Sequence, residues 1–572
     1  MKKVTLRHLS LLLIILAAAF VLGCKEKNSA SGSNDGKKVF RYNQAEGLTS
    51  LDPAFARSQA NIWAVNQLYN GLFELDEYLN PSPAIADSWD VSSDGKIYTF
   101  RLKKGIMFHD SEIFTGGKGR ELTAEDIVYS FKRVVDRNTA SNGAWVFNDK
   151  IMLGADGKTA SDTAFKAVDS HTVRIYLRRP FAPFLYILSM PYTYIVPKEG
   201  VDKYGKDFGS KPVGTGAFKF SKWDQGNGLV MLKNENYWKK DDKLQPLPYL
   251  DAIQVSFIPD KNQAFSSFQQ GDLDFISGIE EGSKDQILNN DGTIKKEFSD
   301  KFNVLRKGYL NTEYIGFQLD PAKYPGGKHP FLDRRVRQAM NYAVNRRNLV
   351  SFLRNKLGIP GEDGVVPTVM PSFDSAKVVG YSYDLSKAQS LLKDAGYGNG
   401  KGFPEVTLYT NVNHSDIAQF LQKAWKEIGI NVKIEQNNFA VHQEMVDNGK
   451  ATLFRGSWLG DYPDAENYLA MFYSNNFTPT GPNKTHFTNP SFDDYFQKVM
   501  AEEDGFKRYA MYHKMDELIM LEAPVVVLYY DEVLRLTQKN VRNLSVNAMN
   551  NLILEKVDFN TPGTDTKVQA SN

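Results

Sequence analysis

The segment from residue 404 to residue 436 constrains the fold more than any other part of the chain. It begins with PEVTLYTN, which has the composition of a β-strand, and continues with a helical stretch whose apolar side chains share one face: Ile417, Leu421, Ala424 and Ile428. Gly429 stands where this helix is expected to stop, and INVKIEQ then alternates apolar and polar residues as a half-buried strand does. A strand, a helix and a strand within about 30 residues predict two parallel strands joined by a right-handed crossover.

Further segments repeat this mixture of strand and helix. KIYTFRLKKG and TVRIYLRRP alternate apolar and polar residues, so we expect two half-buried strands. LTAEDIVYSFKRVVD has Thr123 and Asp126 at the spacing of a capping box and is predicted to be an amphipathic helix against a sheet. The uninterrupted apolar run from Val525 to Leu528 predicts a strand that is buried on both faces. The sequence therefore predicts an α/β protein.

Length and composition favour a multidomain globular protein. With 572 residues the chain is too long for one hydrophobic core, so we expect two or three domains. Its hydrophobic content of 42% is ample for packed cores. The formal net charge is +2 and stays close to zero without the basic residues at the N-terminus, so the charge balance does not indicate a nucleic-acid partner.

The N-terminus has the features of a bacterial secretion signal. Basic residues precede an apolar run from Leu9 to Leu22, which at about 14 residues is short for a membrane-spanning helix and typical of a signal peptide. Cys24 is the only cysteine and ends the sequence VLGC, which resembles the lipobox of bacterial lipoproteins. We therefore expect a signal peptide over residues 1–23 and acylation of Cys24; the alternative is a chance cysteine in a cleaved leader.

The residues after Cys24 are polar and rich in serine and glycine. They lack an apolar periodicity, so residues 24–37 are predicted to form a flexible tether. No later segment has the run of about 18 apolar residues that a membrane helix would need. These features predict a soluble body in the cell envelope, held to a bacterial membrane by lipid and facing the periplasm or the exterior.

Motifs for catalysis, metal binding or nucleotide binding are weak or missing. The glycine-rich stretch from Gly396 to Gly402 follows a predicted helix and lacks the spacing of a phosphate loop, so a helix stop and turn explain it better. The eight histidines form no pair at metal-binding spacing, and His109 is expected to be a turn or surface residue. A GxSxG nucleophile motif is missing as well. We therefore expect no metal, no cofactor and no covalent catalysis.

The stretch GSWLGDYPDAENYLAMFY, from Gly456 to Tyr473, places three carboxylates among large aromatic residues. Asp, Pro and Asn are turn formers, so the segment can be a surface turn. Paired carboxylates can also serve a glycosidase as acid and base, and a carboxylate beside aromatics can bind a cation. Residue types alone leave these three interpretations open.

Four blocks of sequence resemble one protein family and occur in that family's order. They are AIADSWDVSSDGKIYTFRLKKGIMFHD with LTAEDIVYSFKRV, PVGTGAFKFSKWDQGNGLVMLKNENYW, DRRVRQAMNYAVNRRNLV, and GDYPDAENYL. The chain resembles the family 5 extracellular solute-binding proteins of ABC importers, the group of oligopeptide- and dipeptide-binding proteins. The resemblance implies a periplasmic-binding-protein-like α/β fold, with two lobes joined by hinge strands and an additional third domain that grows from a discontinuous first lobe.

The resemblance also implies domain boundaries. Lobe I would comprise residues 38–70, 193–306 and 525–560, the extra domain residues 71–192 and lobe II residues 307–524, followed by a flexible tail over residues 561–572. Many relatives have a short link where this chain has the insert Ser111–Glu121, which we expect to be an exposed loop in the extra domain.

The resemblance assigns a candidate ligand site. In peptide-binding members, the aspartate that matches Asp461 binds the α-ammonium of the ligand, and its neighbours Trp458, Gly460 and Tyr462 are expected to line the pocket. A loop of the first lobe that faces the ligand matches Gly47, Leu48 and Thr49. The other two carboxylates of the stretch, Asp464 and Glu466, are expected to be turn and surface residues.

The resemblance implies a binding protein and no enzyme. The expected function is capture of short peptides and their delivery to an ABC permease by a monomer that is tethered to the membrane. One alternative is the same fold with a non-peptide solute, such as a nickel complex, glutathione, a sugar or an opine; an aspartate at position 461 favours an amine-bearing ligand. The other alternative is a surface hydrolase that uses Asp461 with Asp464 or Glu466.

Overall fold

A computed structural model describes residues 36–278 and 281–560. The expected signal peptide, Cys24, most of the tether and the expected tail lie outside these residues. Within them, none of the helices combines the length and the apolar character that a membrane span requires.

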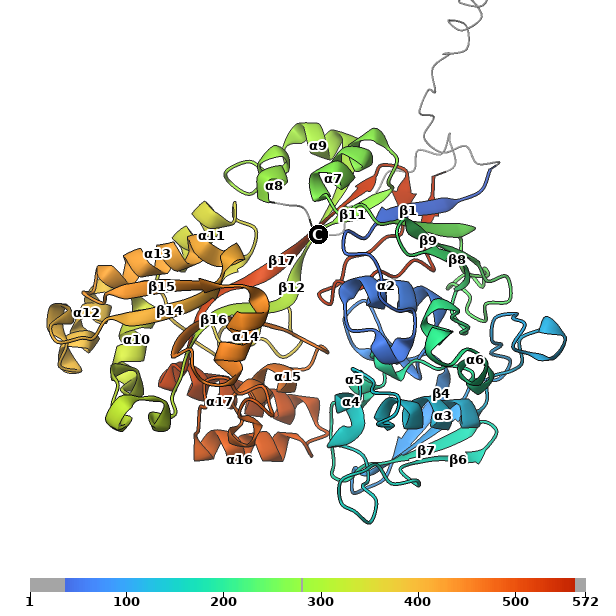
Figure 1. The fold of residues 1–572 in the computed structure, drawn as a ribbon, viewed down its shortest axis with the longest axis horizontal. Helices are drawn as coiled ribbons and strands as arrows, with labels where there is room; N and C mark the ends of the chain where they lie inside the picture. The colour runs from blue at the N-terminus through green and yellow to red at the C-terminus, as the bar shows by residue number, and fades with distance from the viewer. Residues whose placement is uncertain (1–35, 279–280, 561–572) are drawn as a thin grey trace, which may run out of the picture.

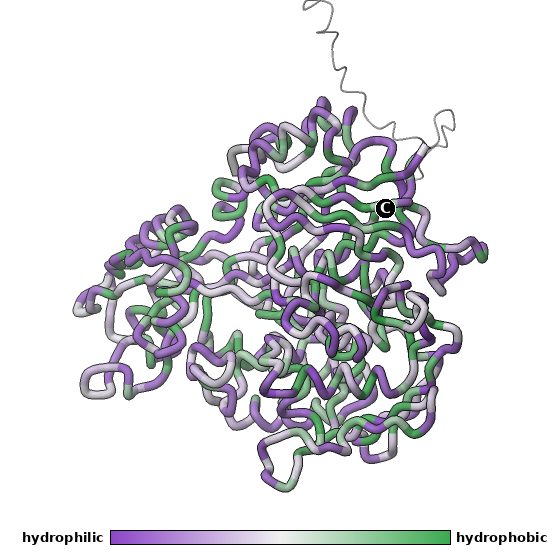
Figure 2. Tube along the Cα trace, turned by 45° about the vertical axis from the view of Figure 1, so that its right-hand side comes forward, coloured by the Kyte–Doolittle hydropathy of each residue, from purple (hydrophilic) through white to green (hydrophobic). Residues whose placement is uncertain are grey.

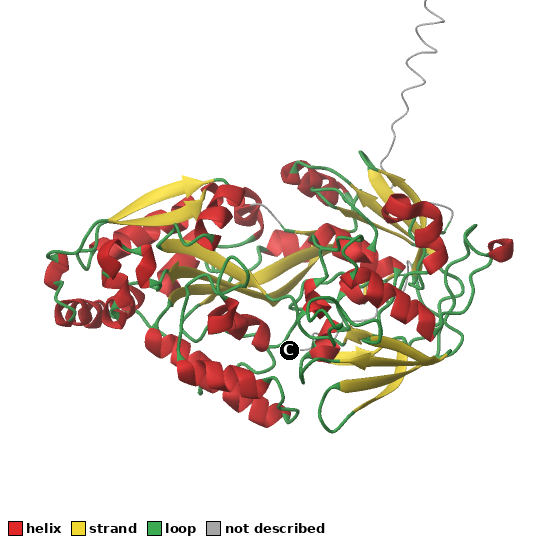
Figure 3. Ribbon diagram, turned by 60° about the horizontal axis from the view of Figure 1, so that its bottom comes forward, coloured by secondary structure: helices red, strands yellow, loops and turns green. Residues whose placement is uncertain are grey.

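One mixed sheet runs through the middle of the molecule and organises the fold (Figures 1 and 3). Along the sheet its strands are β15 (Val432–Asn437), β14 (Val406–Asn411), β16 (Leu453–Leu459), β12 (Phe302–Phe317), β17 (Val525–Gln538), β11 (Phe275–Ser277), β1 (Val39–Asn43), β10 (Ala252–Ser256), β9 (Gly228–Lys233) and β8 (Phe218–Asp224). The short strand β13 (Ile359–Pro360) also pairs with β17. Figure 2 shows hydrophobic segments along these strands and hydrophilic segments on the outer helices and loops.

The long strands β12 and β17 connect the two ends of this sheet (Figure 1). They pair antiparallel from Phe302 opposite Gln538 to Gly316 opposite Val525, with two register shifts, one between Gly308 and Thr312 and one between Glu313 and Tyr314. Near its C-terminal end, β17 also pairs with β11. The C-terminal half of β12 also pairs with β16. Two strands are therefore shared by two halves that otherwise have their own strands and helices.

Helices flank each half of the sheet. On the side of β1 and β8 they are α2 (Gln59–Leu68), α6 (Lys198–Tyr204), α7 (Lys261–Gln270), α8 (Glu281–Ile287) and α9 (Lys296–Lys301). On the side of β14 and β15 they are α10 (Arg334–Tyr342), α11 (Arg346–Leu353), α12 (Leu385–Asp394), α13 (Ser415–Lys426), α14 (Phe439–Asp447), α15 (Glu466–Leu469), α16 (Pro490–Val499) and α17 (Gly505–Glu522). Short 3-10 helices connect several of these elements, among them η1 (Pro53–Phe55) and η3 (Pro191–Thr193).

A smaller antiparallel sheet forms a separate layer (Figure 1). Its strands follow the order β4 (Ala86–Val91), β5 (Ile97–Leu102), β7 (Thr172–Tyr176) and β6 (Phe165–Asp169) and are accompanied by α3 (Ala124–Val135), α4 (Trp145–Asn148) and α5 (Phe184–Ile187). Two-stranded pairs are formed by β2 (Phe73–Leu75) with β3 (Pro81–Pro83) and by β18 (Val541–Arg542) with β19 (Asp558–Phe559). The apolar core of this layer is continuous with that around α15, α16 and α17, and Tyr186 stacks on Tyr462 with ring centroids 6.5 Å apart.

The structure confirms the local predictions that rest on periodicity. β14 and β15 are parallel and in register from Val406 opposite Val432 onward, and α13 connects them. Thr123 and Asp126 form the predicted capping box at the start of α3. The run Val525 to Leu528 is buried within β17. The predicted α/β class is therefore confirmed.

Two local expectations are wrong for reasons of tertiary contact. His109 is buried, its Nε2 lies 3.0 Å from the carbonyl oxygen of Gly216, and burial lowers its pKa to about 4. The insert Ser111–Glu121 is not simply an exposed loop, because Phe114 is buried and Arg120 donates hydrogen bonds to Asp126 at 2.6 Å and to Glu199 at 2.7 Å. The insert is thus anchored against α3 and α6.

Candidate functional site

A cavity of about 700 Å³ lies where segments far apart in the sequence meet. Its walls come from the start of α2, from the region of α4 and η3, from the loop after β16 and from the C-terminal segment. The lining residues are Ala56, Arg57, Gln59, Ile62, Trp63, Leu75, Asn142, Trp145, Ser189, Met190, Pro191, Tyr192, Tyr309, Phe439, Leu459, Gly460, Asp461, Tyr462, Met549 and Asn551. This size and mixture of apolar and polar groups are typical of small-molecule sites.

Asp461 presents a carboxylate to this cavity. Its side chain is accessible to water in the cavity but lies deep among protein atoms, so desolvation raises the pKa of Asp461, although a hydrogen bond from Asn467 opposes the effect. Within residues 36–278 and 281–560, no lysine, arginine or histidine forms an ion pair with it. The positive charge of Lys150 also lowers this pKa, but Lys150 makes no ion pair with Asp461. A carboxylate that faces a cavity without an ion-pair partner favours a cationic ligand.

Strand pairing fixes the position of Asp461. β16 pairs with β12 up to Leu459 opposite Asn311, and the next residue, Gly460, donates its backbone N–H to Leu310 at 2.8 Å. A side chain at Gly460 would bring a Cβ to 3.1 Å from the hydroxyl of Tyr468, which explains a glycine at this close approach. The carboxylate therefore follows the last paired residue of a central strand.

Asn467 holds the loop that carries Asp461. Its side-chain oxygen accepts hydrogen bonds from the backbone N–H of Asp461 at 3.0 Å and from the indole N–H of Trp458 at 2.9 Å. Its side-chain nitrogen donates to Oδ2 of Asp461 at 3.3 Å. Trp458 is half-buried and is not among the lining residues, so its contact with the site runs through Asn467.

The expectation that Asp464 and Glu466 are surface residues is wrong. Asp464 is 3% exposed, accepts a hydrogen bond from the hydroxyl of Tyr512 at 2.5 Å and lies 3.5 Å from Arg508. Glu466 is 7% exposed and accepts a hydrogen bond from the hydroxyl of Tyr462, and burial raises its pKa to about 7. Both carboxylates are therefore buried and accept hydrogen bonds from tyrosine hydroxyls inside the protein.

This geometry argues against the carboxylate pair of a hydrolase. A glycosidase needs two carboxyl groups that face the substrate. Among the three carboxylates of the stretch from Gly456 to Tyr473, only Asp461 lines the cavity. The described part of the chain also has no group of three or more His, Cys, Asp or Glu side chains suited to a metal ion.

The loop with Gly47, Leu48 and Thr49 lies elsewhere. None of the three is among the residues that line the cavity. Thr49 exchanges hydrogen bonds with the side chain of Asn61, at 3.1 Å to its backbone N–H and 2.8 Å to its hydroxyl, so this loop braces α2. The structure thus brings Asp461, Gly460 and Tyr462 to the cavity but not these three residues or Trp458.

Most of the cavity wall on the side of α2 and η3 has no counterpart among the residues predicted from the sequence. Arg57 is exposed to the cavity, and Tyr192, Trp145 and Phe439 line it. None of these residues stands in a motif, and only tertiary contacts bring them together. No sequence signal singles out Arg57, which lies between η1 and the N-cap Ser58 of α2.

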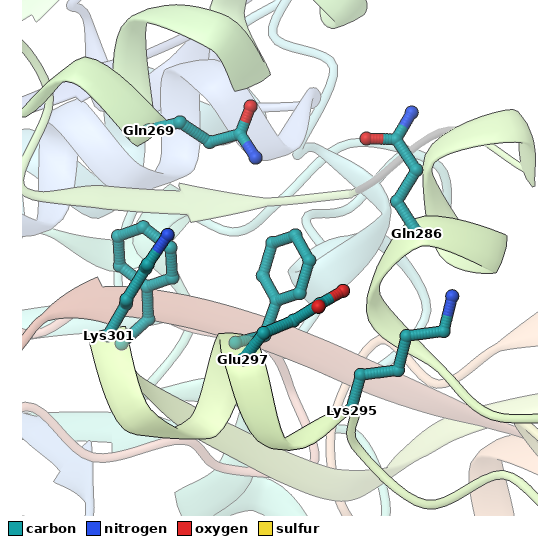
Figure 4. A pocket seen from close by; sticks show the side chains of 7 residues that line it. Gln269, Gln286, Lys295, Glu297 and Lys301 are labelled. Atoms are coloured by element: carbon teal, nitrogen blue, oxygen red, sulfur yellow. The ribbon is translucent and has the colours of Figure 1, made fainter.

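A second hollow, of about 470 Å³, lies between α7, α8 and α9 (Figure 4). Gln269, Gln286, Lys295, Glu297 and Lys301 reach into it from these segments. Their side chains are largely at the surface and mix both charges with neutral amides, so no single ligand chemistry is indicated. The candidate site is therefore the cavity with Asp461.

Comparison with known proteins gives one consistent family. The family described as bacterial extracellular solute-binding proteins, family 5 Middle, matches residues 80–479. Heme-binding protein A of Haemophilus influenzae is 28% identical over 537 residues, covering 90% of this chain and 92% of that protein. Dipeptide-binding protein of Escherichia coli (strain K12) is 27% identical over 510 residues, covering 86% of this chain and 89% of that protein.

A solved structure matches the fold. The ABC transporter-associated periplasmic binding protein DppA from Helicobacter pylori, in complex with the peptide STSA, is 26% identical with a TM-score of 0.67. The match covers 91% of this chain and 98% of that protein. The periplasmic-binding-protein-like α/β fold expected from the sequence is thereby confirmed.

Proposed function

The chain belongs to the bacterial extracellular solute-binding proteins of family 5, and from this premise we propose that it binds short peptides in the cavity at Asp461 and delivers them to an ABC permease. Proteins of this family are solute-binding components of ABC importers and lie in the periplasm or outside the cell. They are transport proteins, so the proposed mechanism is binding without chemistry. The protein acts as a monomer in this proposal.

The observation that carries the proposal is the carboxylate of Asp461, which faces the cavity and forms no ion pair with any described residue. The α-ammonium of a peptide supplies the missing charge. A hydrogen bond between two charged groups is shorter and stronger than one between neutral groups, so this contact would fix the end of the peptide. The named ligands of the dipeptide-binding relative and of the peptide-bound neighbour support this choice.

The rest of the cavity suits peptides of many sequences. Trp145, Phe439 and Leu459 remain 37%, 64% and 49% exposed and provide apolar surface, while Asn142 and Asn551 provide amide groups. A peptide backbone can form hydrogen bonds that do not depend on side-chain identity. The proposed receptor therefore combines one fixed charge contact with adaptable walls.

We propose the domain boundaries given above as the moving parts. Lobe I is residues 38–70, 193–306 and 525–560, the extra domain residues 71–192, and lobe II residues 307–524. β12 and β17 serve as the hinge strands, because they are the long strands that both halves of the sheet share. A ligand that contacts both lobes shifts the equilibrium toward the closed form by its differential affinity.

The test is titration calorimetry of the full-length protein in detergent with an equimolar library of alanine-containing di-, tri- and tetrapeptides. Asp461→Asn keeps the shape of the side chain and removes its charge. We expect a loss of affinity of about 10- to 150-fold, which corresponds to the 1.5 to 3 kcal/mol typical of a hydrogen bond to a charged group. Asp242→Asn, at an exposed aspartate outside the cavity, is the matched control and should leave affinity unchanged.

The same library with acetylated N-termini completes the test. Acetylation removes the ammonium, so we expect these peptides to bind as weakly to the native protein as the free peptides bind to Asp461→Asn. An equal affinity for free and acetylated peptides would overturn the charge anchor. If no peptide binds, the peptide function is refuted, and the ligand has to be sought among the other solutes that proteins of this family bind.

The alternative expected from the sequence is a non-peptide solute such as a nickel complex, glutathione, a sugar or an opine, and the name of one relative, Heme-binding protein A, adds heme. Heme carries two propionates, and a carboxylate at the site repels them. Hemin is therefore the direct competitor to include in the calorimetry. Tight binding of hemin that Asp461→Asn strengthens would favour this alternative over peptides.

We also propose that Cys24 is acylated and holds the protein to a bacterial membrane. The sequence VLGC supports this, together with the short apolar run that precedes it. Cys24→Ala should move the protein from the membrane fraction to the soluble fraction after cell breakage. A variant that stays with the membrane would contradict the lipid anchor.

A further inference from the structure

The strands β12 and β17, which run together between the two halves of the molecule, are irregular beside the candidate site (Figure 1). Their pairing stops after Gly308 of β12 and resumes at Thr312, so residues 309–311 are out of register with the partner strand. Extra residues of this kind bend a strand and re-aim its side chains, and they are common next to functional sites. We call residues 309–311 the β12 bulge.

The β12 bulge contacts the candidate site at two points. Tyr309 lines the cavity. The carbonyl oxygen of Leu310 accepts a hydrogen bond from the backbone N–H of Gly460 at 2.8 Å, and the next residue is Asp461. The position of the bulge and the position of the proposed ligand-binding carboxylate are therefore coupled.

A segment from Gly358 to Val366, which we call the strap, crosses both strands beside the bulge. The hydroxyl of Thr312, the first paired residue after the bulge, donates a hydrogen bond to the carbonyl oxygen of Val365 at 3.0 Å. The hydroxyl of Tyr530, which lies opposite Thr312 on β17, donates to the carbonyl oxygen of Gly364 at 2.6 Å. The strap thus holds both strands at the edge of the bulge.

The first half of the strap is attached to β17. Ile359 of β13 pairs with Tyr530, and Gly361 donates its backbone N–H to the carbonyl oxygen of Leu528 at 3.0 Å. A Cβ at Gly361 would lie 2.6 Å from the side chain of Val527, which explains a glycine at this close approach. The strap therefore follows β17 before it reaches the bulge.

Asp516 of α17 holds the second half of the strap. It is 3% exposed, and its two carboxylate oxygens accept hydrogen bonds from the backbone N–H groups of Val365 at 2.8 Å and Val366 at 3.2 Å. A Cβ at Gly364 would lie 2.1 Å from Oδ2 of Asp516, so only a glycine permits this contact. Burial of a carboxylate is unfavourable unless hydrogen bonds compensate for it. These two hydrogen bonds therefore tie α17 to the strap.

We propose that Asp516 is a positioning residue for the ligand site and acts on Asp461 through the strap and the β12 bulge. Asp516, Thr312 and Tyr530 do not line the cavity, so they act without touching the ligand. The inference rests on the proposed function, because its consequence is the alignment of Asp461 with the ammonium of a ligand. A loosened bulge lowers the fraction of molecules that are ready to bind, and the apparent affinity falls with that fraction.

The first test is calorimetry of the full-length protein in detergent with the alanine tripeptide, free and N-acetylated. Asp516→Asn keeps the size of the side chain but offers one acceptor oxygen to two N–H groups. We expect the free peptide to bind about 3- to 10-fold more weakly, as the loss of one hydrogen bond in the strap predicts. Binding of the acetylated peptide should not change, because this peptide has no ammonium for Asp461. A purely structural role would weaken both peptides alike.

Asp274→Asn is the matched control. Asp274 is also a buried aspartate, 6% exposed, and accepts a hydrogen bond from the backbone N–H of Arg41 at 2.8 Å. It directly precedes β11 and lies outside the strap and the bulge. Both variants should melt at a lower temperature than the native protein, but only Asp516→Asn should weaken the free peptide. Thr312→Val, which removes one hydroxyl and keeps the branched shape, replaces Asp516→Asn if that variant does not fold.

Hydrogen–deuterium exchange of the ligand-free protein gives a result that depends on no ligand. Asp516→Asn should exchange faster than the native protein in fragments that cover residues 308–312 and 456–461, and Asp274→Asn should exchange there at the native rate. Unchanged exchange in Asp516→Asn, or equal weakening of both peptides, would overturn the positioning role while the proposed function stands. If neither peptide binds the native protein, the proposed function fails, and the exchange alone decides whether Asp516 holds the bulge.

Discussion

Asn467 offers the sharpest test of how the protein controls the charge of Asp461. Its side chain makes two acceptor contacts, with the Asp461 backbone and the Trp458 indole, and one donor contact, with the Asp461 carboxylate. Asn467→Ala removes all three. Because Asn467 is only 5% exposed, we expect the free energy of unfolding to fall by about 2 to 4 kcal/mol, from about 1 kcal/mol per hydrogen bond plus the cost of a half-buried indole N–H without a partner.

The pH dependence of binding distinguishes positioning from mere stability. Burial raises the pKa of Asp461, and the hydrogen bond from Asn467 lowers it. Asn467→Ala removes the lowering contribution, so the pKa rises further. The ionised carboxylate is the form that binds an ammonium, and affinity is therefore lost as the pH falls through this pKa. In the variant the loss should begin at a higher pH than in the native protein.

The assay is titration of a free tripeptide between about pH 4.5 and pH 7.5, a range in which the α-ammonium stays largely protonated. Trp458→Phe is the matched control, because it removes one hydrogen bond of Asn467 but keeps both contacts to Asp461. It should lower stability without moving the pH profile. Superimposable profiles for Asn467→Ala and the native protein would refute the argument that Asn467 sets the protonation of Asp461.

Two further predictions concern buried charges. Burial raises the pKa of Glu466 from 4.5 to about 7, so the stability it contributes is complete below about pH 4.5 and is lost as the pH rises through 7. Glu466→Gln should therefore raise the free energy of unfolding by up to about 3 kcal/mol at pH 8 and hardly at pH 5, as measured in urea; a pH-independent effect would contradict this. Arg133→Gln leaves Asp52, which is 3% exposed, without its bidentate partner. The expected loss is about 3 to 5 kcal/mol in the same assay, and a value near zero would show that water replaces the guanidinium.

Local periodicity predicted the fold well where a segment is stabilised by its neighbours. The strand–helix–strand unit around α13 and the capping box of α3 depend on contacts within a few residues, and both are present. His109 and the insert Ser111–Glu121 show the limit of this reasoning. Their burial comes from Gly216 and Glu199, about 80 to 110 positions away, and no local pattern carries that information.

At the candidate site, too, some residues were predicted from the sequence and others depend on tertiary contacts. The resemblance pointed to Asp461, Gly460 and Tyr462, which line the cavity, but it gave no indication of Arg57, which lines the same cavity. Asp464 has the sequence context of an exposed turn, yet it is buried and accepts a hydrogen bond from Tyr512, 48 residues later in the chain. Residue types at a site can thus be anticipated from a motif, whereas the partner that satisfies each one depends on tertiary packing.

The position of Asp461 links the proposed recognition to the proposed motion. Asp461 follows β16 on the side of β14, whereas Ile62 and Trp63 of α2 line the same cavity from the side of β1, so the chain between them passes through the shared strand β12. If a peptide is held by Asp461 and packs against α2, it binds best when the two proposed lobes approach, and it shifts the equilibrium toward the closed form by this differential affinity. An N-acetylated peptide lacks the ammonium that Asp461 is proposed to bind, so it should close the protein less well. Small-angle scattering with free and with acetylated peptides should give two different radii of gyration, and equal radii would contradict the link.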